Sequence, residues 1–139
     1  MYTVVTGAAG FIGFHVAQRL LHAGHTVVGV DNLNAYYDPA LKRARLAWLA
    51  AFPGFRFIEA DVADRAAMAS MFTSSGAQEI VHLAAQAGVR YGLSNPHAYA
   101  DANLTGFLNI LEGARAVRAR HLVFASTSSV YGITPRQPF

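Results

Sequence analysis

The sequence contains no cysteine, which excludes disulfide scaffolds, zinc sites built on cysteine and thiol nucleophiles. Proline and charge are also scarce: the chain has 5 prolines, and only 14% of its residues are charged, whereas 53% are hydrophobic. Disordered chains have the opposite composition, so these 139 residues predict a folded domain with a real core. No apolar run approaches the roughly 18 residues of a membrane helix, and no signal peptide precedes Val4. We therefore expect a cytoplasmic protein with no membrane partner.

Basic residues exceed acidic ones, and the formal net charge is +3. They are spread along the sequence, and their densest group, residues 115–121, falls near the end of an expected helix, where cations complement the helix dipole. We therefore expect no nucleic-acid partner. The six histidines show no metal-ligand spacing, and His82 falls inside an expected strand. The sequence thus predicts no metal site, and no Ser-His-Asp arrangement supports a hydrolase.

Strand and helix patterns alternate along the chain. Short apolar runs predict strands over residues 2–6, 25–31, 55–60, 79–85 and 121–125. Helical spacing and caps predict helices over residues 11–23, from 39 to about 52, from 65 to 75 and from 96 to the basic group. We expect loops over 32–37 and 86–94 and no regular element over 126–139. The expected core faces are Ile12, Val16 and Leu20 on the first helix and Leu104, Phe107, Leu108 and Leu111 on the last.

This alternation predicts an α/β fold with a doubly wound parallel sheet of the Rossmann type and strand order 3-2-1-4-5. Such sheets usually carry six or more strands, and this sequence stops after the fifth. We therefore expect a sheet truncated after its fifth strand, with that strand as an edge and one sheet face bare and apolar. The isolated segment should be poorly soluble and inactive.

A glycine-rich turn lies between the first expected strand and the first helix. Gly7 allows the tight turn, Gly10 lets a pyrophosphate approach the backbone, and Gly13 lets the helix pack closely. Free N–H groups and the helix dipole then hold the anion. Glycines at this spacing are weak evidence by themselves, but the strand before, the helix after and an acid downstream strengthen the prediction of a dinucleotide site.

That acid is Asp31, which ends the second expected strand, 18 residues after Gly13. A carboxylate there accepts hydrogen bonds from the adenosine ribose and repels a 2′-phosphate, which favours NAD over NADP. Asp61 ends the third expected strand, where it would bond the adenine amino group. A turn aspartate is the structural alternative for Asp31, and helix capping the alternative for Asp61, although Asp64 is the better cap.

Two further polar segments follow expected strands, at the carboxyl ends of the strands, where parallel sheets bind ligands. Ser126–Ser129 would offer hydroxyls to a sugar, and Arg90 in the 86–94 loop would reach a phosphate or carboxylate. Alone, a Ser/Thr cluster after a strand is more often a solvated loop, but the glycine turn and Asp31 in the same chain favour binding for it. For Arg90, a surface arginine is an equally good interpretation.

Five segments resemble extended short-chain dehydrogenases/reductases, the NAD-dependent epimerase/dehydratase family: TGAAGFIG, VDNLNAYYD, HLAAQAGVRY, DANLTGFLNILE and FASTSSVYG. The glycine turn is common to the superfamily, whereas DNLNAYYD and AQAGVRY are closer to its UDP-glucuronate 4-epimerases. The resemblance covers residues 2–139. It implies that residues 1–139 are the N-terminal part of an NAD-binding Rossmann domain and that the C-terminal substrate-binding portion is absent.

The resemblance also implies roles for individual residues. The pyrophosphate would be held by Gly7, Gly10, Phe11, Ile12 and Gly13. The ribose would contact Asp31 and Asn32, the adenine Asp61 and Val62, and the rest of the cofactor Leu83, Ala84, Ala85 and the nearby Asn103. Thr127 matches the catalytic residue that bonds the reacting 4-hydroxyl. Substrate would also contact Ser128, Ser129, Gln86 and Arg90.

The implied activity is the NAD-dependent 4-epimerisation of a nucleotide sugar, UDP-glucuronate to UDP-galacturonate, in polysaccharide biosynthesis. The cofactor takes a hydride from C4 and returns it to the other face of a 4-keto sugar. Dehydratases and decarboxylases of the family carry an acid after the threonine, whereas Ser128 and Ser129 follow Thr127 here, which favours simple epimerisation. The family's base, the tyrosine of Tyr-x-x-x-Lys, is absent: Pro135 stands four residues after Tyr131.

Other interpretations stay open. The sugar could be UDP-glucose/UDP-galactose, or the enzyme a related decarboxylase or dehydratase. The chain could instead be a non-catalytic NAD-binding module, or a structural fragment that supplies an edge strand and binds no NAD. Relatives often dimerise through helices at this sheet edge, so we expect that the full-length enzyme can form a homodimer.

Overall fold

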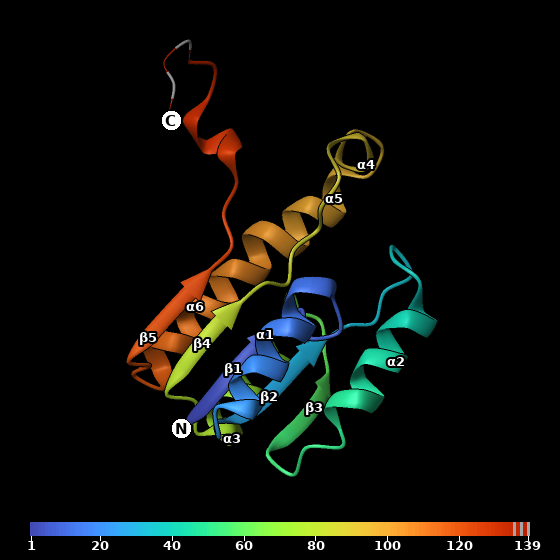
Figure 1. The fold of residues 1–139 in the computed structure, drawn as a ribbon. Coiled ribbons are helices and arrows are strands. Elements are labelled where there is room, and N and C mark those ends of the chain that lie inside the picture. Colours follow the sequence, from blue (N-terminus) through green and yellow to red (C-terminus); the bar gives the residue numbers. More distant parts are fainter. Residues whose placement is uncertain (135, 137, 139) are drawn as a thin grey trace.

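The computed structural model describes residues 1–134, 136 and 138. Five parallel strands form one sheet in the order β3-β2-β1-β4-β5 (Figure 1). The strands are β1 (Tyr2–Thr6), β2 (Thr26–Asp31), β3 (Phe55–Glu59), β4 (Glu79–His82) and β5 (His121–Phe124). The predicted fold class and strand order are confirmed.

Helices connect the strands. They are α1 (Phe11–His22), α2 (Pro39–Leu49), α3 (Arg65–Ser75), α4 (Val89–Ser94), α5 (Pro96–Tyr99), the π-helical turn η1 (Ala100–Thr105), α6 (Gly106–Ala116) and the 3₁₀ turn η2 (Ser128–Tyr131). Asp38 and Asp64 cap α2 and α3 through their side chains, as predicted. Among the described residues no helix is long and apolar enough to cross a membrane.

The sheet is covered on both faces because successive strand residues point to opposite sides. Val5 and Val27 pack with Leu21 of α1 and Leu49 of α2 in one buried cluster. Their neighbours Val4 and Val28 point the other way and pack against α3 and α6; Met68, Phe72 and Ile110 complete that cluster. Figure 1 shows α1 in front of the sheet and α6 behind it.

The core faces of two helices differ from the prediction. On α1 the buried residues are Gly13, Ala17 and Leu21. Of the predicted face, Val16 and Leu20 are partly buried against the core, while Ile12 is 62% exposed. On α6 the buried residues are Gly106, Ile110 and Gly113, while Leu104 on η1 and Leu108 and Leu111 on α6 are exposed. Of the predicted face only Phe107 packs inward, on the rings of His82 and Phe124. Small residues let both helix backbones approach their neighbours closely: a Cβ on Gly113 would overlap the Phe72 ring.

Several predicted boundaries and loops differ from the structure; helix α2, for example, ends at Leu49 rather than near residue 52. Strand β4 ends at His82 rather than residue 85, because the N–H groups of Leu83 and Ala84 donate to the Thr6 hydroxyl. The predicted 86–94 loop contains α4, and the predicted irregular tail contains η2, whose first turn is capped by the side chain of Thr127. Positions 135, 137 and 139 of that tail lie outside the described residues.

Strand β5 lies at the edge of the sheet, as predicted. Val123 and Phe124 on it are about half exposed. A second apolar surface, made of Ile12, Val16 and Leu20 with neighbouring α1 residues, forms a shallow groove. Apolar surface is therefore exposed on the outer side of helix α1 and along the β5 edge of the sheet.

Candidate functional site

A cavity of about 440 Å³ opens at the carboxyl ends of the central strands. This is where open parallel sheets bind ligands, and the volume falls in the range of small-molecule sites. Of the predicted residues it is lined by Gly7, Gly10, Phe11, Ile12, Gly13, Asp31, Asn32, Asp61, Val62, Leu83, Ala84, Ala85 and Gln86. The structure thus gathers most of the predicted cofactor contacts around one cavity.

The glycine turn forms one wall of the cavity, and its glycines are required sterically. Gly7 has a φ of +71°, and a Cβ there would lie 2.9 Å from the backbone of Leu83 and Ala84. A Cβ on Gly13 would overlap the Gly7 carbonyl oxygen. Helix α1 therefore starts in contact with the turn itself, which holds the helix N-terminus at the cavity.

Gly10 caps α1 in an extended conformation, with φ −71° and ψ 171°. The first-turn N–H groups of a helix have no partner within the helix and carry the positive end of its dipole. Phe11, Ile12 and Gly13 provide this first turn, and all three line the cavity. The wall is thus suited to an anion such as a pyrophosphate.

Asp31 is buried at the end of β2, where several donors hold its carboxylate. Oδ2 accepts from the backbone N–H of Ala9 at 3.1 Å, and Oδ1 accepts from the N–H of Leu33 at 2.9 Å. The Lys42 ammonium lies 3.5 Å from Oδ1. The carboxylate is therefore fixed in position beside the glycine turn, facing the cavity.

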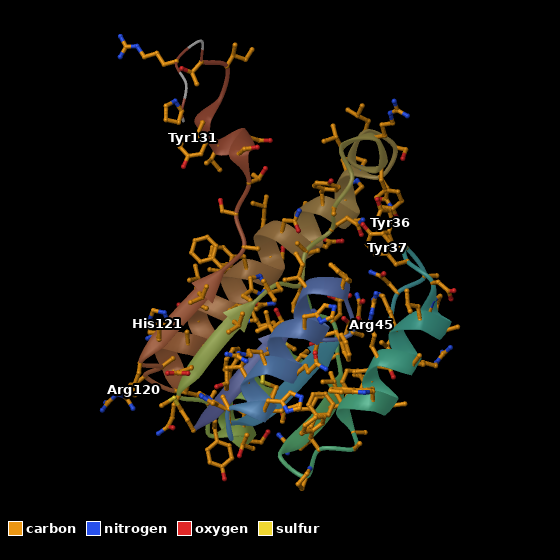
Figure 2. The ribbon with its side chains drawn as sticks, in the orientation of Figure 1. Tyr36, Tyr37, Arg45, Arg120, His121 and Tyr131 are labelled. Atoms are coloured by element: carbon orange, nitrogen blue, oxygen red, sulfur yellow. The ribbon has the colours of Figure 1, made fainter. Side chains whose placement is uncertain are left out.

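Two cations from α2 belong to this wall, and neither was predicted as a site residue. Lys42 is only 6% exposed and donates to the backbone and side-chain oxygens of Asn34 at 3.1 and 3.3 Å. Arg45 donates to the Ala9 carbonyl at 3.1 Å and lies over the Phe11 ring (Figure 2). They stand three residues apart on one helix face, a spacing from which they could have been found.

Asn32 and Asp61 join the ends of β2 and β3 across the cavity floor. The Asn32 amide donates to Asp61 Oδ2 at 2.8 Å, and the other Asp61 oxygen accepts from the N–H of Ala63. The Val62 carbonyl is held by the side chain of Asn109 on α6. Carboxylate and amide groups thus stand together beside the apolar Val62, as a ribose and a purine require.

The wall after β4 is fixed from two sides. Thr6 holds Leu83 and Ala84 through its hydroxyl. Asn103, in the π-helical turn, accepts from the Gln86 N–H at 2.9 Å and donates to its carbonyl at 3.0 Å. Single π-helical turns within helices often mark functional sites, and here the turn directs Asn103 at the cavity wall. Asn103 itself is not among the lining residues; it acts on Gln86.

The other predicted substrate residues are not brought to the cavity. Arg90 lies exposed on α4, and Thr127, Ser128 and Ser129 lie exposed on the segment that leaves β5 (Figure 1). The Thr127 oxygen accepts from the Ser129 N–H at 3.2 Å. The lining set around the glycine turn is therefore suited to hold a dinucleotide, and the residues predicted to contact sugar stand outside it.

The sequence model described as the NAD dependent epimerase/dehydratase family matches residues 3–139. A probable UDP-glucuronate 4-epimerase of Rhizobium meliloti is 52% identical over the whole chain, which covers 41% of that relative. The Bacillus cereus UDP-glucuronic acid 4-epimerase, solved with UDP-glucuronic acid and NAD, aligns at a TM-score of 0.86 and 31% identity over 98% of this chain and 43% of that one.

A UDP-glucose 4-epimerase from Thermus thermophilus, solved with NAD, aligns at a TM-score of 0.83 and 34% identity, over 99% of this chain and 41% of that one. These proteins share the fold seen here. The chain spans about two fifths of the length of each of these three.

Proposed function

Because the chain belongs to the NAD dependent epimerase/dehydratase family, we propose that its cavity binds NAD. The observation that carries this proposal is that the glycine turn, the α1 N-terminus and the fixed Asp31 carboxylate line the same cavity. The close fit of Gly7 and Gly13 leaves the backbone bare where a pyrophosphate would approach. The residues present therefore fit the cofactor.

The lining residues would contact successive parts of the cofactor along the cavity. We assign the pyrophosphate to Gly10 and the first turn of α1, the ribose to Asp31 and Asn32, and the adenine to Asp61 and Val62. Leu83, Ala84 and Ala85 would line the remainder, with Asn103 holding Gln86 in place. The fixed carboxylate of Asp31 would accept from the ribose hydroxyls and disfavour a 2′-phosphate.

For the whole protein we propose 4-epimerisation of UDP-glucuronate to UDP-galacturonate. The similarity to proteins named for this activity supports that substrate class. The sequence Thr127-Ser128-Ser129, with no acid, supports simple epimerisation. NAD supplies the hydride acceptor and donor for C4. Thr127 would hold the 4-hydroxyl, with Ser128, Ser129, Gln86 and Arg90 around the sugar. The base would be a tyrosine of a Tyr-x-x-x-Lys motif outside residues 1–139.

A homodimer is part of the proposal for the whole protein. Leu104, Leu108 and Leu111 lie along the α5–α6 helix and are 72, 58 and 41% exposed. Contiguous exposed apolar surface is typical of protein–protein interaction sites. We assign it to a second copy of the chain.

The test uses the protein as its source cell produces it. NADH binding is followed by fluorescence, and UDP-glucuronate turnover by chromatography, for the wild type, Asp31→Ala and Glu59→Ala. Glu59 is the exposed acid paired with Asp31 in the sheet register, so it is a matched control. We expect Asp31→Ala to weaken NADH binding at least tenfold and Glu59→Ala to leave it unchanged.

Each alternative gives its own result. Turnover of UDP-glucose in place of UDP-glucuronate would reassign the sugar. NADH binding without turnover of any nucleotide sugar would leave a cofactor-binding module. Failure of the wild type to bind NADH would overturn the proposal itself.

A further inference from the structure

Two tyrosines from distant segments pack together above the cavity. Tyr36 lies on the loop between β2 and α2, and Tyr91 lies on α4, after β4. Their ring centroids are 4.9 Å apart with the planes tilted at 57°, and Tyr37 packs on Tyr36 at 4.7 Å. Figure 2 shows Tyr36 and Tyr37 reaching from the β2–α2 loop toward α5.

The contact depends on Gly88, at the N-terminus of α4. Its φ is +93°, a conformation that favours glycine. A Cβ at this position would overlap the Tyr36 hydroxyl, so the missing side chain leaves the hollow that this hydroxyl occupies. Glycine is thus favoured at position 88 for two reasons: its φ is positive, and the Tyr36 hydroxyl occupies the space that a Cβ would take.

Each tyrosine is anchored on its own side. The Tyr91 hydroxyl accepts from the Asn95 amide at 3.0 Å. The Tyr36 N–H donates to Asn34 Oδ1 at 3.3 Å, and Lys42 binds both oxygens of Asn34. The Tyr36–Tyr91 contact therefore joins two segments that are each tied to the rest of the fold.

The two segments are opposite walls of the cavity. Asn34, Tyr36 and Tyr37 line it on the β2 side, and Gln86 and Ala87 line it on the β4 side. The Tyr36–Tyr91 contact therefore joins two walls, and a ligand along the carboxyl ends of the strands would lie between them.

We propose that Tyr36 and Tyr91, meeting in the hollow left by Gly88, form a clasp that slows the dissociation of the dinucleotide. This inference rests on the proposed binding of NAD and adds the residues that retain it. Desolvation, and then the neighbouring tyrosine hydroxyls, raise the pKa of Tyr36 above its ordinary value. The clasp is an aromatic contact, and it should depend on the ring rather than on the hydroxyl.

The experiment measures how fast NADH leaves the whole protein when it is displaced by excess NAD⁺ in a stopped-flow fluorimeter. We expect Tyr36→Ala and Gly88→Ala each to speed release by about 3- to 10-fold, the range expected for one aromatic pair. Tyr36→Phe should release NADH at nearly the wild-type rate. Gly24→Ala is the matched control, because Gly24 has a φ of +82° but open space around it.

Thermal unfolding of each variant separates retention from folding. Release that is faster in Tyr36→Ala and Gly88→Ala, but not in Tyr36→Phe or Gly24→Ala, supports the clasp. Wild-type release rates in Tyr36→Ala, or equal acceleration in Gly24→Ala, would overturn the clasp while leaving NAD binding in place. A wild type that binds no NADH would instead overturn the proposed function, and the clasp with it.

Discussion

The Thr6 hydroxyl oxygen and Nδ1 of His82 are hydrogen-bonded at 2.7 Å, across the neighbouring ends of β1 and β4. The Thr6 oxygen accepts from the N–H groups of Leu83 and Ala84, both at 3.1 Å. Because those bonds occupy the acceptor sites of the hydroxyl, its only proton is directed at the imidazole. His82 is thereby held as the neutral tautomer, with Nδ1 as the acceptor.

This arrangement predicts an acid sensitivity that belongs to His82. Burial lowers the pKa of His82 from 6.5 to about 4, so the unfolded chain binds a proton more readily than the folded one between those values. Stability should be full above pH 6.5 and fall as the pH drops toward 4. In His82→Gln that part of the fall should vanish, up to about 3 kcal/mol.

Urea unfolding at pH 7, 5.5 and 4 measures this difference. His121→Gln, which removes an exposed imidazole at the start of β5, is the matched control. Equal losses of stability in wild type and His82→Gln across this range would contradict the assignment.

The buried pair of Lys42 and Asp31 predicts strong coupling between two substitutions. Lys42→Met leaves the Asp31 carboxylate buried without its cation, which should cost about 3 kcal/mol. In an Asp31→Asn background the same change should cost about 1–3 kcal/mol less. A double-mutant cycle by urea unfolding checks this, with the exposed Arg43→Met as control. Strictly additive costs would show that the ion pair does not stabilise the fold.

Substitutions at two glycines of the turn should affect stability and NADH binding to different extents. Gly13→Ala places a Cβ on the Gly7 carbonyl, so we expect a loss of about 1–3 kcal/mol where a helical glycine-to-alanine change normally gains stability. Gly10→Ala meets only that same oxygen, at 3.1 Å, and lies on the cavity wall. It should lose less stability than Gly13→Ala and bind NADH at least tenfold more weakly. Unfolding midpoints measure the stability of both variants, and NADH titrations measure their affinity. Unaltered NADH affinity in Gly10→Ala would contradict the assignment of the pyrophosphate to this wall.

The exposed leucine row predicts the oligomeric state of the whole protein. Leu108 is 58% exposed on α6, and a charge there would stand at the centre of the proposed dimer contact. We expect Leu108→Glu to convert a dimer into a monomer, as measured by light scattering. The exposed Leu93→Glu on α4 should remain dimeric. A monomeric wild type would contradict the dimer.

Much of the fold could be predicted because its signals are local. Apolar runs of strand length and cap residues such as Asp38 and Asp64 act within a few positions, so the order of elements follows from neighbouring residues. The roles of Gly7 and Gly13 in the turn were predictable for the same reason. Asp31 was predicted as a site residue from its spacing of 18 residues after Gly13.

Other features depend on which segments meet. The buried face of α6 follows from its approach to Phe72, and α4 forms where Tyr91 can reach Tyr36 across the cavity. Lys42 enters the site only because α2 packs beside β2. The sequence by itself determined the sheet, the glycine turn and the acid behind it, because those are matters of spacing. Only the tertiary structure decided which cations and aromatic rings surround them, because such contacts join residues that are distant in the chain.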